Sequence, residues 1–255
     1  MLIVIAAILG LLTGMTASML GIGGGVLLVP LLHILFGLEM HEAVGTSLFI
    51  VFFLSSLAAF SYLREKLTLW KLGLAFGCGG VPGAYVGSVV SYMVPSTLLR
   101  IAFSILVLYL SIRMWRKKSP SKGGKMISKK SLNLGEPKTM LLLLLLGFMA
   151  GFLSGLLGIG GGVVVVPIMN LLLGIPIHNS IATSVLTVVI TTLAGSSTHI
   201  VMGGVRYDVG LWLAPSAMLG SYLGTKISVK LKGILLSRIF SILLVFIAVR
   251  MFLST

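Results

Sequence analysis

The chain has 255 residues, of which 57% are hydrophobic and only 9% are charged, and its mean hydropathy is +1.15. Globular domains in water carry about a quarter charged residues, so this composition excludes a water-soluble fold and predicts a membrane protein. The formal net charge is +14, but nine of the 19 Lys and Arg lie within residues 113–138. Such clustering beside apolar segments indicates a cytoplasmic membrane loop and argues against a nucleic-acid partner.

The apolar segments follow one another in two groups of five. A transmembrane helix needs about 20 mostly apolar residues. The first group lies near 1–20, 25–38, 43–63, 70–92 and 96–115. The second group lies near 138–157, 162–175, 180–200, 207–229 and 233–253. We therefore expect an all-α polytopic fold with a first repeat (1–115), a basic cytoplasmic linker (116–137) and a second repeat (138–255).

The two groups are copies of one unit. Leu20-Gly-Ile-Gly-Gly-Gly-Val26 recurs as Leu157-Gly-Ile-Gly-Gly-Gly-Val163, an offset of 137 residues. Proline, histidine and a Thr-Ser pair recur at the same offset: Pro30 and Pro167, His41 and His178, Thr46-Ser47 and Thr183-Ser184. The second segment of each repeat is short, and the sequence leaves open whether it spans the membrane or re-enters it.

The basic turns change place between the copies. In the first repeat the basic turn is 64–71, whereas in the second it is 226–238, which corresponds to the opposite side of the unit. Basic loops lie on the cytoplasmic side, so each repeat must cross the membrane an odd number of times. The pattern predicts an inverted repeat with both termini outside, although Arg100, Arg206 and Arg250 depart from the rule. Inverted repeats with interrupted helices are typical of secondary transporters.

The glycine runs are the main candidate binding elements. Consecutive glycines interrupt a helix, and a broken helix in lipid persists where it lines a cavity or permits close packing. The N–H groups that begin the next helix favour an anion. We expect substrate contacts at Gly21, Gly23, Gly24, Gly25, Gly158, Gly160, Gly161 and Gly162. The glycine pairs Gly10/Gly14, Gly83/Gly87, Gly147/Gly151 and Gly220/Gly224 are interpreted instead as helix-packing positions.

Polar residues at the start of the third segment of each repeat are further candidates. The hydroxyls of Thr46, Ser47, Thr183 and Ser184 could donate to an anion, or simply bond the preceding helical turn. His41 and His178 are candidate proton-coupling groups because histidine titrates near neutral pH, with helix capping as the alternative. Three residues within the fourth segments rank lower: Tyr85 and Tyr222 as buried phenols, and Cys78 as an inert buried thiol. The histidines His33 and His199, whose counterparts at the 137-residue offset are Asn170 and Tyr62, are weaker candidates as well.

Enzyme functions find no support in the residues. The five acidic residues fall in loops or at segment ends, and no Ser/His/Asp set or metal-ligand cluster can be assembled. The glycine runs lack the Lys-Ser/Thr that ends a P-loop. We therefore expect no catalytic residues, no metal and no cofactor.

The repeated GxxxG-x6-GIGGGxxxVP frame, with its H-x4-TS element, resembles the TauE/SafE family of sulfite and organosulfonate exporters. The resemblance covers both repeats and implies a multi-pass protein of the cell membrane that handles a small sulfur-containing anion. It also implies substrate contacts at the two glycine runs and the Thr-Ser pairs beside them.

The function expected from these features is secondary transport of such an anion by alternating access. An anion channel on the same scaffold, or a non-transporting accessory subunit, are the alternatives. The sequence does not decide the substrate, the direction of transport, the coupling ion or whether the chain forms a homo-oligomer.

Overall fold

The computed structural model describes residues 2–115 and 136–231, with four further isolated positions at 238, 242, 245 and 249. These residues are helical or lie in short connections, without strands. The helices are α1 (Leu2–Leu20), α2 (Gly25–Leu35), α3 (Met40–Arg64), α4 (Trp70–Met93), α5 (Ser96–Trp115), α6 (Pro137–Leu157), α7 (Gly162–Pro167), the π-helix η1 (Ile168–Leu172), α8 (Ile177–Val201) and α9 (Tyr207–Lys230). Nearly all of the predicted linker and tenth segment lies outside the described residues.

The predicted segments correspond to these helices within a few residues, and the all-α polytopic fold is confirmed. Within the described residues, α3, α4, α6 and α8 are long and apolar enough to cross a membrane. The second segment is shorter: α2 has 11 residues, about 16 Å of helix, against about 30 Å of hydrocarbon core. Its counterpart passes from α- to π-helix directly after Pro167, whose missing N–H interrupts the regular bonding pattern.

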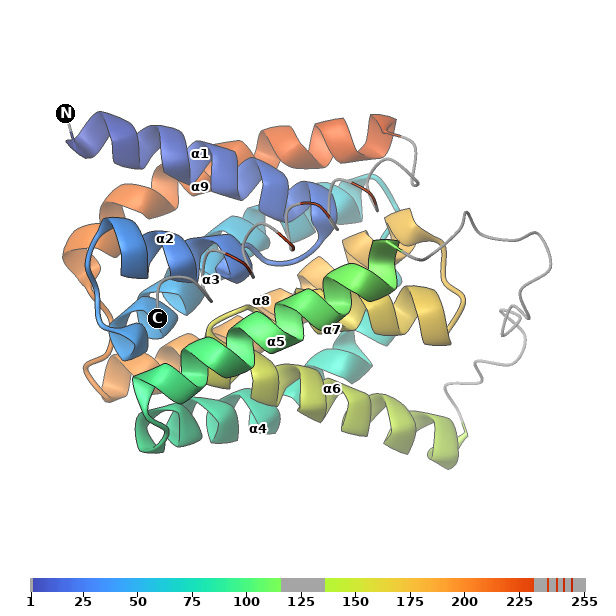
Figure 1. The fold of residues 1–255 in the computed structure, drawn as a ribbon. Coiled ribbons are helices and arrows are strands. Elements are labelled where there is room, and N and C mark those ends of the chain that lie inside the picture. The colour runs from blue at the N-terminus through green and yellow to red at the C-terminus, as the bar shows by residue number, and fades with distance from the viewer. Residues whose placement is uncertain are drawn as a thin grey trace.

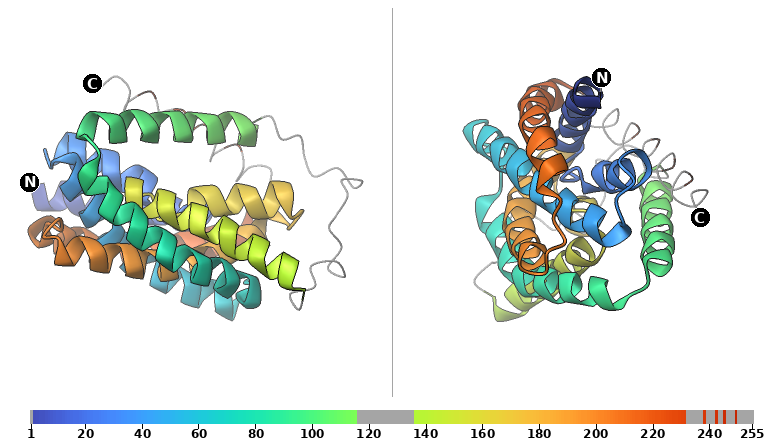
Figure 2. Two further views of the ribbon diagram at one scale, coloured as in Figure 1. Left: turned by 90° about the horizontal axis from the view of Figure 1, so that it is seen from below. Right: turned by 90° about the vertical axis from the view of Figure 1, so that its left-hand side faces the viewer.

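Helices from different halves pair with one another. In Figure 1, α1 lies beside α9 at the top, α4 lies beside α6 at the bottom, and α3 and α8 lie between the pairs. Figure 2 shows the same pairs on opposite sides when the molecule is viewed along its helices. A Cβ added to any of the eight predicted packing glycines would collide with the paired helix. Their interpretation as packing positions is therefore confirmed.

The central helices α3 and α8 run in opposite directions. Gly45 lies against His199 near one end of the crossing, Gly195 lies against Leu48, and Val51 and Val188 both lie against Gly23. Outside them, α1 runs parallel to α9. Gly10 lies against Ser216, and nearer the ends of both helices the Met19 carbonyl accepts a hydrogen bond from Ser228. The corresponding helices α3 and α8 thus have opposite chain directions.

These directions define two faces of the bundle. We call the face with the start of α3, the end of α8 and the 202–206 connection face A, and the face with the 65–69 connection and the start of α8 face B. The Asn179 side chain donates to the Leu67 carbonyl on face B at 2.8 Å. His178 contacts the Leu231 carbonyl there at 3.0 Å, so the end of α9 is also on face B. Face B therefore gathers basic residues of both halves: Arg64, Lys66, Lys71, Lys226 and Lys230.

Candidate functional site

The two glycine runs form loops of the same backbone conformation. Gly21, Gly23 and Gly24 have φ of 69°, 77° and 89°. Gly158, Gly160 and Gly161 have φ of 71°, 76° and 78°. This left-handed region is accessible to glycine at little cost, which explains why the break needs glycines in these places. Both loops are completely buried, from Gly21 to Val26 and from Leu157 to Val163.

The two loops meet at the centre of the bundle, where α3 and α8 cross. A Cβ added to Gly160 would lie 3.1 Å from Val51 of α3, 3.4 Å from Val188 of α8 and 3.7 Å from the Cα of Gly23. At the ends of the loops, the last glycine of each loop lies against the first glycine of the other. A Cβ on Gly25 would collide with the Gly158 carbonyl, and a Cβ on Gly162 would collide with the Gly21 carbonyl.

Each loop leads directly into a helix whose first donors have no acceptor within the helix. The N–H groups of Leu27 and Leu28 both bond the carbonyl of Gly24, at 2.9 Å each. The N–H groups of Gly25 and Val26 precede these bonds, as the first N–H groups of any helix do. Gly161 accepts from Val164 and Val165 in the same way at 3.0 Å. Two sets of backbone donors therefore begin at the centre, a chemistry suited to a small anion.

Ser47 and Ser184 tie each central helix to the loop of the other half. Ser47 Oγ donates to the Gly158 carbonyl at 3.0 Å, and Ser184 Oγ donates to the Gly21 carbonyl at 2.8 Å. Both side chains are fully buried. In this conformation their protons are engaged, so these serines hold the loops in place rather than presenting a free donor to the centre.

Thr46 and Thr183 make the equivalent tie to the connections between helices. Thr46 Oγ1 accepts from the Arg206 N–H at 2.9 Å on face A, and Thr183 Oγ1 accepts from the Leu69 N–H at 2.9 Å on face B. Arg206 and Leu69 are themselves related by the 137-residue offset. The four predicted hydroxyls thus form two equivalent pairs: Thr46 and Ser47 toward face A, and Thr183 and Ser184 toward face B.

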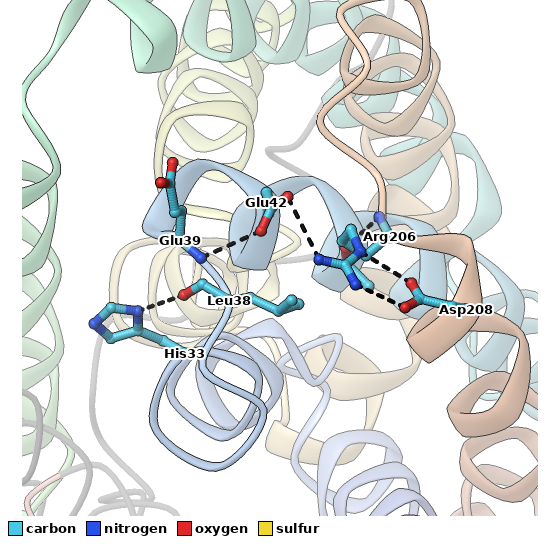
Figure 3. Close-up of polar contacts among 7 residues, drawn as sticks. His33, Leu38, Glu39, Glu42, Arg206 and Asp208 are labelled. Carbon is cyan, nitrogen blue, oxygen red and sulfur yellow. Dashed lines mark hydrogen bonds and ion pairs between the residues drawn. The ribbon is translucent and has the colours of Figure 1, made fainter.

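An ion-pair cluster covers the Thr46 tie on face A (Figure 3). Arg206 makes a bidentate pair with Asp208, at 3.0 and 2.7 Å, and lies 3.8 Å from Glu42. Hydrogen bonding to Asp208, reinforced by Glu42, raises the pKa of Arg206. This arginine departs from the basic-face pattern, but two carboxylates compensate its charge. Glu42 also accepts from the Glu39 N–H at 3.3 Å in the capping box that begins α3.

The predicted histidines lie at the two faces, away from the loops. His41 Nε2 contacts Ser96 Oγ at 3.3 Å on face A, and His178 Nε2 contacts the Leu231 carbonyl at 3.0 Å on face B. Neither side chain is fully buried. Among the described residues there is no group of three or more His, Cys, Asp or Glu side chains that could hold a metal ion.

Three predictions about other side chains are wrong. Tyr85 is 58% exposed and Tyr222 is 41% exposed on the outer surface of the bundle, and Cys78 is exposed as well. Hydropathy finds an apolar helix but does not tell which of its faces meets lipid, and these three residues are on that outer face. They are not candidates for the site.

Two further polar residues lie near the second loop: Ser154, which was not among the predicted candidates, and His199, which ranked only as a weaker one. The Ser154 hydroxyl is fully buried, has no hydrogen-bond partner within the described residues, and belongs to a side chain whose Cβ would lie 3.4 Å from a Cβ on Gly161. His199 is also fully buried. Their counterparts at the 137-residue offset are Ala17 and Tyr62, so the signal available was a polar side chain that differs between the two copies.

Comparison with known proteins identifies the family of the chain. The sequence model of the family described as "Sulfite exporter TauE/SafE" matches residues 6–251, which include both halves. The chain belongs to the TauE/SafE family. The TauE/SafE resemblance proposed from the repeated motif is therefore confirmed, and with it a membrane protein of a transporter family.

The relatives of this TauE/SafE protein carry general names. It is 32% identical to "Probable membrane transporter protein YunE" of Bacillus subtilis, over 96% of this chain and 95% of that one. It is also 32% identical to "Probable membrane transporter protein MJ0441" of Methanocaldococcus jannaschii, over 88% and 85% of the two chains. No solved structure matches the chain significantly.

Proposed function

We propose that this TauE/SafE protein is a secondary transporter that moves a small sulfur-containing anion by alternating access between its two halves. The observation that carries the proposal is the meeting of two identical glycine loops at the centre, each tied to the opposite half. The loops contain no carboxylate and end in helix N-termini, so their chemistry suits an anion rather than a cation.

The matched ties give each face its own gate. On face A the Thr46–Arg206 bond closes the side of the centre where α8 ends, and on face B the Thr183–Leu69 bond closes the side where α8 begins. Because the gates are equivalent by offset, either one can open while the other stays closed. The buried loops of the present structure then correspond to a state closed toward both faces. The unpartnered Ser154 hydroxyl supplies an additional donor near the second loop.

We further propose that face B is cytoplasmic in the cell membrane, because it gathers the basic residues. Corresponding helices with opposite directions then make the two halves an inverted repeat. Single cysteines test this orientation in a Cys78→Ser background. Glu65→Cys on face B should react with a charged maleimide only from the cytoplasmic side, and Met202→Cys on face A only from the outside. Reaction of both from one side would refute the inverted arrangement.

Transport is tested with purified protein in liposomes. Uptake of labelled sulfite, sulfate, thiosulfate, taurine, sulfoacetate, methanesulfonate and chloride should saturate for one sulfur anion and show counterflow when the same anion is loaded inside. Saturable uptake without counterflow would favour the channel. The double variant Gly24→Val/Gly161→Val should abolish uptake, whereas Gly37→Ala, at a positive-φ glycine with no atom within 4 Å of the added Cβ, should retain it. Full uptake by a folded double variant would make the loops structural.

A further inference from the structure

One of the two gates contains a buried histidine, and the other contains a tyrosine in the same place. His199 of α8 and Tyr62 of α3 are related by the 137-residue offset, as are Gly155 and Ser18. Tyr62 Oη donates to the Ser18 carbonyl at 2.8 Å, and His199 Nε2 lies 3.5 Å from the Gly155 carbonyl. The two gates therefore share one design, but at this buried position face A has a histidine where face B has a tyrosine.

The contacts of His199 define its neutral tautomer. A carbonyl oxygen can only accept, so Nε2 carries the ring proton and donates toward Gly155. Nδ1 is then the acceptor, and Tyr92 Oη donates to it at 3.0 Å. His199 is fully buried, with a relative exposure of 0%. A proton bound at this position is therefore held away from water, with Tyr92 as its immediate neighbour.

A chain of aromatic and polar side chains connects His199 with face A. Tyr92 is half-buried, and its ring lies 5.2 Å from that of His199. The His41 ring also stacks on Tyr92, at 5.6 Å with an interplanar angle of 14°. His41 Nε2 contacts Ser96 near the surface, and its Nδ1 is buried without a hydrogen-bond partner among the described residues. Tyr92 is thus hydrogen-bonded to His199 and stacked on His41, so the three rings link His199 with face A.

His199 is also joined to the candidate anion site. Gly155, which it contacts, lies in the last turn of α6, immediately before the loop that begins at Gly158. The Gly158 N–H bonds the carbonyl of Ser154 at 2.8 Å. A Cβ on Gly158 would contact Val44 of α3, next to Gly45, which lies against His199, so a positive charge on His199 would be buried near the Gly158 end of the second loop. Opposite charges attract strongly under these conditions.

We propose that His199 is the proton-binding group of the transporter and that Tyr92 and His41 form its connection to face A. The inference rests on the proposed transport function and adds its coupling ion. Protonation places a proton on Nδ1, and the Tyr92 hydroxyl turns from donating to this atom to accepting from it. No other bond is broken. The anion at the second loop balances the imidazolium, so anion and proton bind together and each strengthens the binding of the other.

The titratable and charged groups around His199 indicate that His199 and His41 together bind one proton at a time. The titratable groups that face it are Tyr92 from α4 and His41 from α3, and α6 presents only the Gly155 carbonyl. Gly204 lies against Tyr92. Arg206, two residues further along the chain, is held in ion pairs with Glu42 and Asp208. On α5, Arg100 follows Ser96 by one turn. A second positive charge on His41 would oppose protonation of His199, so the cluster holds one proton at a time.

The test uses liposomes and labelled methanesulfonate, because a sulfonate stays ionised throughout the pH range and cannot itself carry the proton. With one proton per univalent anion, a gradient of one pH unit should drive about tenfold accumulation. His199→Gln should lose this accumulation and retain counterflow, which needs no net proton movement. Tyr92→Phe should slow accumulation. His33→Gln serves as the control and should accumulate methanesulfonate like the wild type, because His33 of α2 contacts the Leu38 carbonyl in the connection after that helix.

Two outcomes would overturn the proposal: accumulation by wild type that ignores the pH gradient, or accumulation by His199→Gln that equals wild type. If methanesulfonate and the other anions are not transported at all, the transport function fails, and the histidine is judged by a separate measurement. In labelled protein the imidazole NMR signals that His199→Gln removes should change with pH between pH 5 and 8 when sulfate is present. A signal that stays constant over that range would refute proton binding at His199.

Discussion

The close contact between the glycine loops predicts that Gly25→Ala destabilises the protein, whereas helix propensity alone predicts that it stabilises it. Gly25 begins α2 in an ordinary helical conformation, so Gly25→Ala should stabilise the helix by up to about 1 kcal/mol on propensity alone. The packing says otherwise. An added Cβ would collide with the Gly158 carbonyl and lie 2.7 Å from the Cα of Ile159. Both obstacles are backbone atoms, which cannot turn aside as a flexible side chain can.

The cost can be worked from the neighbouring bonds. Overpacking a close contact costs roughly 1–3 kcal/mol. Moving the Gly158 carbonyl also weakens the hydrogen bond from Ser47, at 3.0 Å, which contributes about 1 kcal/mol. We therefore expect Gly25→Ala to lower the free energy of unfolding by roughly 2–4 kcal/mol. The equivalent change Gly162→Ala should cost about the same, because its Cβ would collide with the Gly21 carbonyl and lie 2.9 Å from the backbone of Ile22.

The assay is unfolding in detergent, followed by loss of the monodisperse peak on size-exclusion chromatography as temperature or denaturant increases. Gly37→Ala is the matched control. Its φ of 65° disfavours alanine, but no atom lies within 4 Å of the added Cβ, so backbone strain of about 1–2 kcal/mol is the only cost. Gly25→Ala as stable as wild type, or more stable than Gly37→Ala, would refute the close approach of the loops.

Three further predictions concern the polar ties, each measured by the same unfolding assay. Ser47→Ala and Ser184→Ala should each destabilise by roughly 1–3 kcal/mol, because each leaves a buried carbonyl without its donor; costs that differ by more than this range would contradict their equivalence. Thr46→Val should cost more than Arg206→Ala, because the threonine accepts a partly buried backbone N–H, whereas the arginine side chain is 45% exposed and surface ion pairs contribute about 0–1 kcal/mol; the reverse order would show that the charge closes face A. Tyr62→Phe should cost roughly 1 kcal/mol through its bond to the Ser18 carbonyl, and no loss would indicate that this bond is absent from the folded protein in detergent.

The sequence analysis was most successful where the evidence is local. Hydropathy located the nine described segments, and the repeat located both loops and the Thr-Ser pairs. It was wrong about Tyr85, Tyr222 and Cys78, which face outward. Periodicity could not correct this, because helices in lipid are apolar on every side, unlike amphipathic helices in water.

The sequence by itself determined that the chain lies in a membrane, that it is built twice from one unit, and where each unit is interrupted. These properties depend on composition and on spacing along the chain. Only the tertiary structure decided that Ser47 bonds Gly158 and that Thr46 bonds the Arg206 backbone, across separations of 111 and 160 residues. It also placed Tyr92 against His199, 107 residues away. Partners so distant follow from which helices pack together, and in a chain of uniformly apolar helices that choice depends on the shape of the contact surfaces, set by glycines at the helix pairs and the loops.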